Sequence, residues 1–194
     1  MQIGPDNFML DPIFSDRASP VQLFGPKRFQ KPPCTIPELP HINAVFISHD
    51  HYDHMDQPSL RMLHKCFKPI FIAGLGSGDI LPKKSNQMLM DWMDSKVIEI
   101  NGRSYRITFV PTCHWGKRKF HDLNTRLWGG VIIETPFDQK IYYSGDTGYC
   151  PVFKEIGKKF GPFDLTVLPI GAYLPRDLLK PQHVNPEEAV IVHR

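Results

Sequence analysis

The sequence has no long apolar run, no Cys-x-x-Cys pair and no block of charge of one sign. No stretch reaches the ~18 apolar residues of a membrane-spanning helix, and the first residues lack the apolar segment of a secretory signal, so we expect an intracellular protein. The cysteines are scattered, which excludes a zinc knuckle and a disulfide scaffold; they are Cys34, Cys66, Cys113 and Cys150. The 23 basic residues barely outnumber the 20 acidic ones, which argues against a nucleic-acid partner.

Two residue types are in excess. Proline occurs 19 times in 194 residues, about twice the usual ~5%, and predicts long loops. Histidine occurs nine times, and three of the nine lie between positions 49 and 54, which indicates a metal. The apolar fraction of 41% and the charged fraction of 22% are those of a globular protein. The length predicts one domain, residues 1–194.

Strand patterns alternate with helix patterns along the chain, which predicts an α/β architecture with a mixed sheet. Apolar runs indicate strands at residues 7–10, 44–47, 69–73, 97–100, 106–110, 127–134, 140–144 and 163–170. Helices are expected at 58–67, 85–95 and 151–160, and from Asn185 onward. The helix at 85–95 would place Met88, Leu89, Trp92 and Met93 on one side. Such a stripe is more often part of the core, and the alternative is a face that contacts acyl chains.

The strongest chemical signal is the segment from His49 to His54, which directly follows the buried strand 44–47. Ligands at the carboxyl end of a strand are typical of open α/β sites. His49 and His51 point the same way in an extended segment, because side chains alternate, so both can bind one ion. Asp53 and His54 follow the turn and are available to a second ion.

Two later strands also end in a candidate ligand. His114 follows the strand that ends at Val110, and Asp146 follows the strand 140–144 between two glycines. His49, His51 and His114 would give one ion three nitrogens and an open position, as in catalytic zinc. Asp146 would bridge this ion to the one held by Asp53 and His54. Imidazole and carboxylate without thiolate favour zinc, and two such ions lower the pKa of a shared water and predict hydrolysis.

The pattern His49-x-His51-x-Asp53-His54, with His114 and Asp146, resembles the metallo-β-lactamase superfamily. Longer motifs resemble one family within it, the phospholipases D that hydrolyse N-acylphosphatidylethanolamine. Those motifs include residues 11–15, 17–20, 25–29, 114–118, 145–151, 160–164, 169–173 and 182–184.

The resemblance implies an αββα sandwich with two zinc ions and hydrolysis of N-acylphosphatidylethanolamine to N-acylethanolamine and phosphatidic acid by hydroxide generated at the metals. The resemblance implies the same metal ligands as the sequence pattern above. It also implies catalytic roles for Asp53 and Asp146, and it places His183 close to the substrate head group. The partners implied are a phospholipid substrate, the cytosolic face of a membrane bound peripherally, and a second copy in a homodimer.

The chain also departs from the family pattern. The family's first strands would precede Met1, and the histidine that completes the second metal site would follow Arg194. His193 could substitute for that histidine, but it lies on the helix that begins at Asn185. We therefore expect a domain truncated at both ends, with weakened affinity for the second metal.

Two other functions remain open from the sequence. One is a related metallo-hydrolase that acts on a soluble phosphorylated lactone or on RNA, with the same metals and a different pocket. The other is a truncated, non-catalytic remnant that binds lipid or metal.

Overall fold

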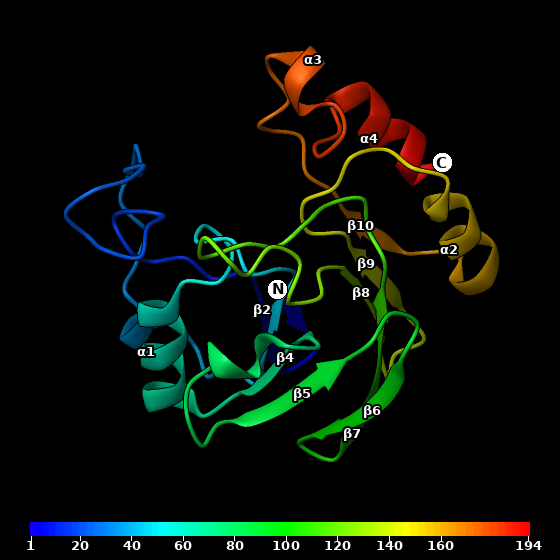
Figure 1. Ribbon diagram of the computed structural model, residues 1–194. Coiled ribbons are helices and arrows are strands. Elements are labelled where there is room, and N and C mark those ends of the chain that lie inside the picture. Colours follow the sequence, from blue (N-terminus) through cyan, green and yellow to red (C-terminus); the bar gives the residue numbers. More distant parts are fainter. The chain divides into compact units, whose positions relative to one another are not determined.

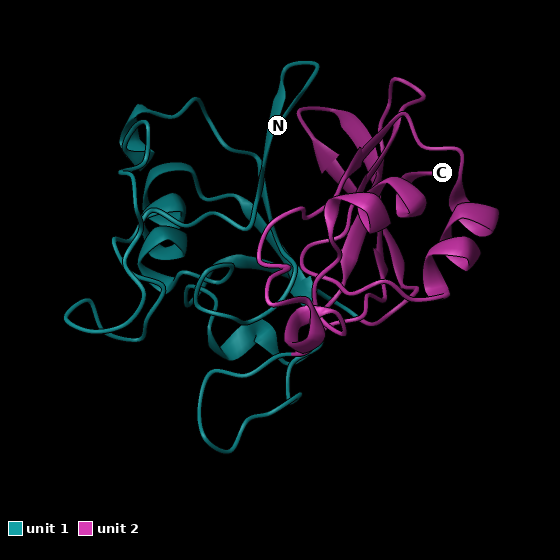
Figure 2. Ribbon diagram, turned by 90° about the horizontal axis from the view of Figure 1, so that it is seen from above, with its two compact units in different colours: residues 1–90, 116–127 teal, residues 91–115, 128–194 magenta.

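The computed structural model describes residues 1–194 (Figure 1). The chain divides into two compact units, each built on its own five-stranded sheet (Figure 2). The N-terminal unit comprises Met1–Met90 and Gly116–Leu127, and the C-terminal unit comprises Asp91–Trp115 and Trp128–Arg194. Each unit is therefore made from two separate pieces of sequence.

The sheet of the N-terminal unit has the strand order β1-β2-β3-β4-β5. Its strands are β1 (Gln2–Ile3), β2 (Asp6–Leu10), β3 (Ala44–Ile47), β4 (Ile70–Gly74) and β5 (Asn86–Met90). Strands β2 to β5 are parallel, and β1 pairs with β2 in the antiparallel sense. All four residues of β3 are buried, as its continuous apolar run predicts for a strand covered on both faces.

Helix α1 (Gln57–Phe67) connects β3 to β4 and packs its apolar side on the sheet. It begins after Asp56 with a proline in its first turn and ends at Lys68 in the left-handed conformation. Leu60 and Leu63 are fully buried in a core with Val45, Ile47 and Phe71. Two short 3-10 helices, η1 (Ile36–Glu38) and η2 (Ser77–Asp79), interrupt the loops, and the proline-rich stretch before β3 forms the predicted long loop.

The sheet of the C-terminal unit has the order β10-β9-β8-β7-β6. Its strands are β6 (Ser95–Ile100), β7 (Arg103–Val110), β8 (Gly130–Glu134), β9 (Lys140–Tyr143) and β10 (Leu165–Val167). Strands β6 to β9 are antiparallel, and β10 runs parallel to β9 after the crossover helix α2 (Val152–Phe160). Ile132 and Tyr142 of the sheet pack with Phe153 and Ile156 of α2.

The helix predicted from Asn185 is present as α4 (Pro186–His193), preceded by the short α3 (Arg176–Leu179). The Asn185 side chain accepts a hydrogen bond from the backbone N–H of Glu188 at 2.8 Å, which satisfies one unpaired donor of the helix N-terminus. Arg176 pairs with the Glu188 carboxylate and joins α3 to α4.

One sequence prediction is wrong and a second is wrong in part. Residues 85–95 form strand β5 and a turn, not a helix, because Met88–Met90 pair with Ile72–Gly74 and Met93 takes a left-handed φ of 68°. The proposed helical face of Met88, Leu89, Trp92 and Met93 therefore does not exist. The strand at 163–170 shortens to β10, a partly exposed edge strand, with Leu165 47% exposed.

None of the helices combines the length and the apolar character that crossing a membrane requires.

Candidate metal centre

The loop after β3 brings four predicted ligands together within the N-terminal unit. The Nε2 atom of His49 lies 2.8 Å from the Nδ1 atom of His51, so the two imidazoles converge on one point. His54 follows one turn later, where its N–H and that of Met55 bond to the carbonyl oxygen of His51. Asp53 is exposed, and its carboxylate lies 3.8 Å from His54 Nε2.

Asp11 supports this loop from the neighbouring strand. Because β2 runs parallel to β3, the residue that follows β2 reaches the carboxyl end of β3, where the Asp11 N–H bonds to the carbonyl oxygen of Phe46. The Asp11 carboxylate accepts from the N–H and the hydroxyl of Ser48, at 2.7 and 2.5 Å, and lies 2.6 Å from His54 Nδ1. A carboxylate on one ring nitrogen orients the other nitrogen for a metal.

Asp50 lies between the two histidines in sequence and is buried within the unit. Its side chain is fully buried, and one carboxylate oxygen accepts from Arg126 at 3.2 Å. Burial raises the pKa of Asp50, and the bond from Arg126 opposes that rise. A side chain on Gly116 would lie 2.7 Å from the Asp50 carboxylate, so this approach requires glycine.

Arg126 also binds two further acids, Asp79 at 2.7 Å and Asp122 at 2.8 Å. Burial alone would raise the pKa of Asp122, but bonds from the backbone N–H groups of Lys119 and Arg118 and from Arg126 hold that pKa well below its usual range. The Gly116–Leu127 segment thus fixes the ligand loop through a buried arginine shared by three acids.

Arg118, on the same segment, donates to the carbonyl oxygens of Asp50 and Met55, at 2.7 and 2.9 Å. Its guanidinium lies 4.0 Å from the ring centroid of Tyr52, whose hydroxyl donates to the Arg118 carbonyl. The loop from His49 to Met55 is therefore held at both ends by one side chain.

The remaining predicted residues gather within the C-terminal unit. His114 follows β7 and Asp146 follows β9, and the loops that carry them are joined by hydrogen bonds. The Thr147 hydroxyl accepts from the Cys113 N–H at 2.9 Å, and the Gly148 N–H bonds to the Cys113 carbonyl at 2.8 Å. These hydrogen bonds hold the two loops side by side within this unit.

His183 joins the same group. Its Nδ1 atom lies 3.8 Å from the Asp146 carboxylate, and its ring lies 5.3 Å from that of His114. The preceding residue, Gln182, accepts from the indole N–H of Trp115 at 2.6 Å, and its carbonyl lies 3.2 Å from His114 Nδ1. The segment that carries His183 is thus tied to the His114 loop by side chains of both.

The chemistry of these donors fits divalent metal ions. The N-terminal unit offers Asp11, His49 and His54 with ligand atoms within 4.8 Å of one another. His51 and Asp53 lie beside them. The C-terminal unit contains its own group, made by His114, Asp146 and His183. Imidazole with carboxylate, without thiolate, is typical of zinc, iron or manganese.

Sequence reasoning missed the residues that hold the ligands. Asp11 carries a readable signal, an acid directly after a strand. Arg126 and Asp122 lie in a loop of no regular pattern, and nothing in the sequence pairs them with Asp50.

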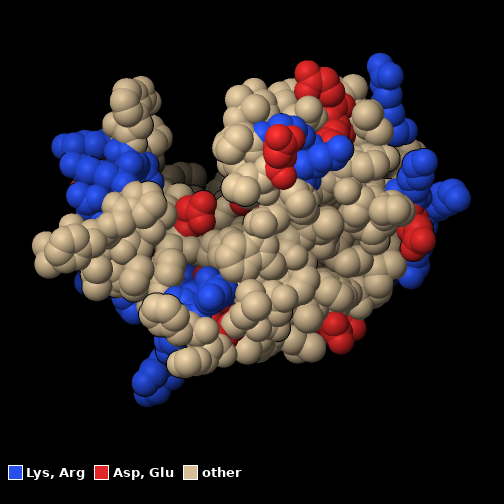
Figure 3. Space-filling view, turned by 45° about the horizontal axis from the view of Figure 1, so that its top comes forward, with Lys and Arg blue, Asp and Glu red and all other residues tan.

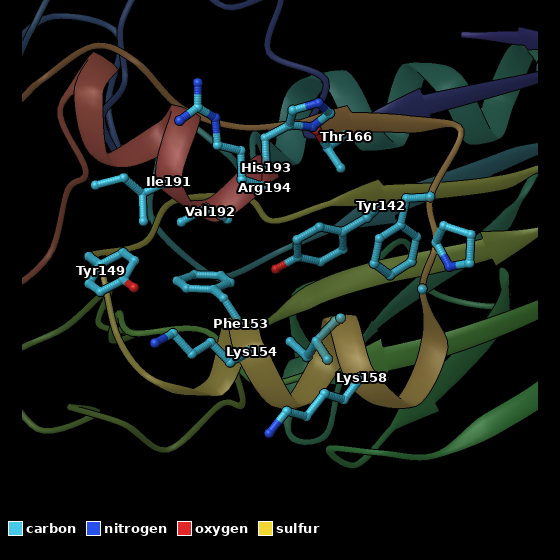
Figure 4. Close-up of a pocket in the computed structure, with 15 residues that line it drawn as sticks. Tyr142, Tyr149, Phe153, Lys154, Lys158, Thr166, Ile191, Val192, His193 and Arg194 are labelled. Atoms are coloured by element: carbon cyan, nitrogen blue, oxygen red, sulfur yellow. The ribbon is translucent and has the colours of Figure 1, made fainter.

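A separate cavity of about 640 Å³ lies in the C-terminal unit between α2 and α4 (Figure 4). Phe153, Ile191 and Val192 line it, and the buried hydroxyl of Tyr142 has no hydrogen-bond partner there. His193 borders this cavity, and its Nδ1 atom lies 2.7 Å from the Thr166 hydroxyl. It therefore does not join His114, Asp146 and His183.

Comparison with known proteins agrees with the predicted fold class. Residues 6–194 match the model of the β-lactamase superfamily domain. Two hydrolases share the fold at low sequence identity. The isothiocyanate hydrolase from Delia radicum gut bacteria has a TM-score of 0.70 at 20% identity, over 99% of this chain and 75% of that one. A metallo hydrolase from Ignicoccus hospitalis has a TM-score of 0.67 at 18% identity, over 98% and 71%.

Two curated relatives have higher sequence identity to this chain than these two structures have. The chain is 40% identical to N-acyl-phosphatidylethanolamine-hydrolyzing phospholipase D 1 of Caenorhabditis elegans, over 96% of this chain and 55% of the relative. It is 32% identical to the mitochondrial N-acyl-phosphatidylethanolamine-hydrolyzing phospholipase D of Saccharomyces cerevisiae, over 94% and 40%. The chain thus spans about half the length of these curated relatives.

Proposed function

The chain belongs to the β-lactamase superfamily, and from this we propose that it forms part of a zinc-dependent phosphodiesterase that hydrolyses N-acylphosphatidylethanolamine. The observation that carries the proposal is the ligand loop at the end of β3, where His49 and His51 converge and Asp11 orients His54. The likeness to the two phospholipases supports the choice of substrate.

The ligand assignment made from the sequence is part of this proposal. His49, His51 and His114 are proposed for the first zinc, Asp53 and His54 for the second, and Asp146 for both. When bound, such ions acidify a water and stabilise the oxygens of a phosphodiester undergoing displacement.

The protein's own groups would prepare the site for that chemistry. Asp11 holds His54 in one orientation, and Asp50 with Arg126 fixes the backbone between His49 and His51. His183 is held beside Asp146, where an imidazole can donate a hydrogen bond to a phosphate oxygen of the head group.

The test is product analysis with the 194-residue chain and with a longer chain that extends to the length of the relatives. Each is supplied with zinc and N-acylphosphatidylethanolamine in detergent micelles, and the lipids are separated by chromatography. We expect N-acylethanolamine and phosphatidic acid in equal amounts from the longer chain, and loss of both with His51→Ala. Failure of the zinc-loaded longer chain to release N-acylethanolamine would reject the substrate.

Zinc counting separates this function from a non-catalytic remnant. We expect zinc to bind and to fall on His51→Ala, while His121→Ala, a histidine on the exposed part of a loop, leaves the zinc content unchanged. Less than one zinc per chain, with poor folding, would favour the remnant. Hydrolysis of a phosphorylated lactone or of RNA in place of the lipid would favour the soluble-substrate enzyme.

A further inference from the structure

The segment from Arg17 to Lys31 contains a hydrogen-bonded loop, yet it presents apolar side chains to water. Phe29 is 100% exposed, Leu23 81%, Phe24 74% and Val21 49%. We call these four side chains the apolar tip. The loop projects from the N-terminal unit, in blue at the left of Figure 1.

Polar bonds fix the base of the loop. Arg17 and Lys27 form an antiparallel bridge, and the N–H of Ala18 bonds to the carbonyl of Pro26 at 3.0 Å. The Gln22 side chain accepts from the N–H of Arg17 and donates to its carbonyl, both at 3.1 Å. The Arg17 guanidinium donates to the carbonyl of Gly25 at 2.6 Å.

Gly25 permits the turn that this base requires. Its φ is 101°, in the region that favours glycine, and a side chain there would lie 2.7 Å from the Ser19 Cβ. On the far side, Arg28 donates to the carbonyls of Ser15 and Ile13, at 3.0 and 2.9 Å. Hydrogen bonds on both sides of the apolar tip therefore hold its backbone in one conformation.

Basic residues are concentrated in the same segment as the apolar tip. Between residues 16 and 31 the chain carries four of them against one acid, whereas its net formal charge is only +3 over 194 residues. Lys27 and Lys31 are exposed. Figure 3 shows blue side chains gathered beside tan ones on the projecting part of the surface at the left. Aromatic and aliphatic side chains next to cations match a bilayer with anionic head groups, where the cations meet phosphates and the apolar groups enter the acyl boundary.

We propose that the Arg17–Lys31 segment is a membrane-docking element, whose Leu23, Phe24 and Phe29 insert into an anionic bilayer while Lys27 and Lys31 bind its head groups. This rests on the proposed function in one respect only, because a phospholipid substrate gives the enzyme a reason to dock.

The test is cosedimentation of the 194-residue chain with vesicles of phosphatidylcholine, with and without phosphatidylserine. We expect binding that strengthens with phosphatidylserine and weakens with salt. Leu23→Ser/Phe24→Ser/Phe29→Ser should lower the partition coefficient at least about tenfold, given the apolar area these side chains would bury. Phe120→Ser, which removes a side chain 92% exposed outside the loop, is the matched control and should bind as the wild type does.

The charge contribution is tested in the same way. Lys27→Gln/Lys31→Gln should remove the effect of phosphatidylserine, and Lys83→Gln/Lys84→Gln, an exposed pair elsewhere in the unit, should not. Equal binding by the wild type and the triple variant, or no binding of the wild type to either vesicle, overturns the proposal. A dimer in solution that the triple variant dissociates also overturns it, since a second copy would then cover the apolar tip.

Hydrolysis in detergent micelles separates this proposal from the proposed function. The triple variant should keep the wild-type rate there, because micelles remove the need to dock on a bilayer, and His51→Ala should keep vesicle binding. Vesicle binding that depends on the apolar tip, without any hydrolysis, would reject the function and retain the docking element. Thermal unfolding at the wild-type temperature shows that the variants fold.

Discussion

The Asp50 carboxylate and the Arg126 guanidinium meet at 3.2 Å in the interior of the N-terminal unit, 76 positions apart in sequence. Asp50 is the residue between two proposed metal ligands, and its side chain is fully buried. The buried negative charge of Asp50 is thus balanced by Arg126, which belongs to the second piece of sequence in this unit.

Arg126→Met should destabilise the N-terminal unit by about 3–5 kcal/mol, because it leaves the buried Asp50 charge without its partner. Denaturant unfolding followed by circular dichroism measures this loss. Adding Asp50→Asn should restore part of it, since the neutral side chain costs less to bury. Arg106→Met, at an exposed arginine of β7, should change stability by no more than about 0.5 kcal/mol. Equal losses in both single variants would contradict the role of Arg126.

Asp11→Asn should lower zinc affinity about 10-fold to 100-fold, because the variant loses the negative charge beside His54 Nδ1. Asparagine tolerates the left-handed φ of 43° at this position, so the backbone is retained. Competition with a chromophoric chelator measures the affinity. The exposed Asp16 provides the control Asp16→Asn, which should bind zinc as the wild type does. An unchanged affinity in Asp11→Asn would show that Asp11 is structural only.

Gly148→Ala should destabilise the C-terminal unit by about 1–3 kcal/mol, because the new methyl group would overlap the carbonyl group of Pro181, whose carbon lies 2.6 Å away. The overlap would separate the Asp146 loop from the segment that carries His183. Thermal unfolding measures the effect. Gly157→Ala is the matched control in α2, where nothing lies within 4 Å, and should stabilise the helix by about 0.5–1 kcal/mol. A loss in both variants would point to backbone conformation and not to the overlap.

Cys150 should react slowly with iodoacetamide, because burial raises the pKa of its thiol from 9.0 to about 11 and little thiolate exists near pH 8. Peptide mass spectrometry should find the exposed Cys66 modified first. The raised pKa also predicts how the free energy of unfolding varies with pH. Below pH 9 the Cys150 thiol is protonated in both states and does not change this free energy. Between pH 9 and about 11 the thiol ionises in the unfolded chain but not in the folded one, so the free energy of unfolding falls as the pH rises. Modification of Cys150 as fast as Cys66 would contradict this environment.

The strands with strong apolar runs are predictable from the sequence, since β3 and β4 of the first sheet and β9 of the second fall within a residue or two of their predicted bounds. The helix at 85–95 failed because a short apolar run fits both periods, and its pairing with β4 decides the outcome. The proposed ligands were chosen from the sequence because each lies in a loop that follows a strand, and their assignment stays a prediction. Arg126 was not, because its partners come from distant loops that only the folded backbone assembles.

The division of each unit into two pieces of sequence has a consequence for synthesis. When the ribosome has made the first 90 residues, the parallel sheet and the histidine loop are complete in sequence, but the counter-charge of Asp50 is still untranslated. It emerges only after β6 and β7 of the other unit. The nascent histidine loop should therefore stay loosely ordered until Arg126 leaves the exit tunnel and pairs with Asp50. Formation of the metal centre then has to wait until the ribosome has translated well beyond the Arg126 codon.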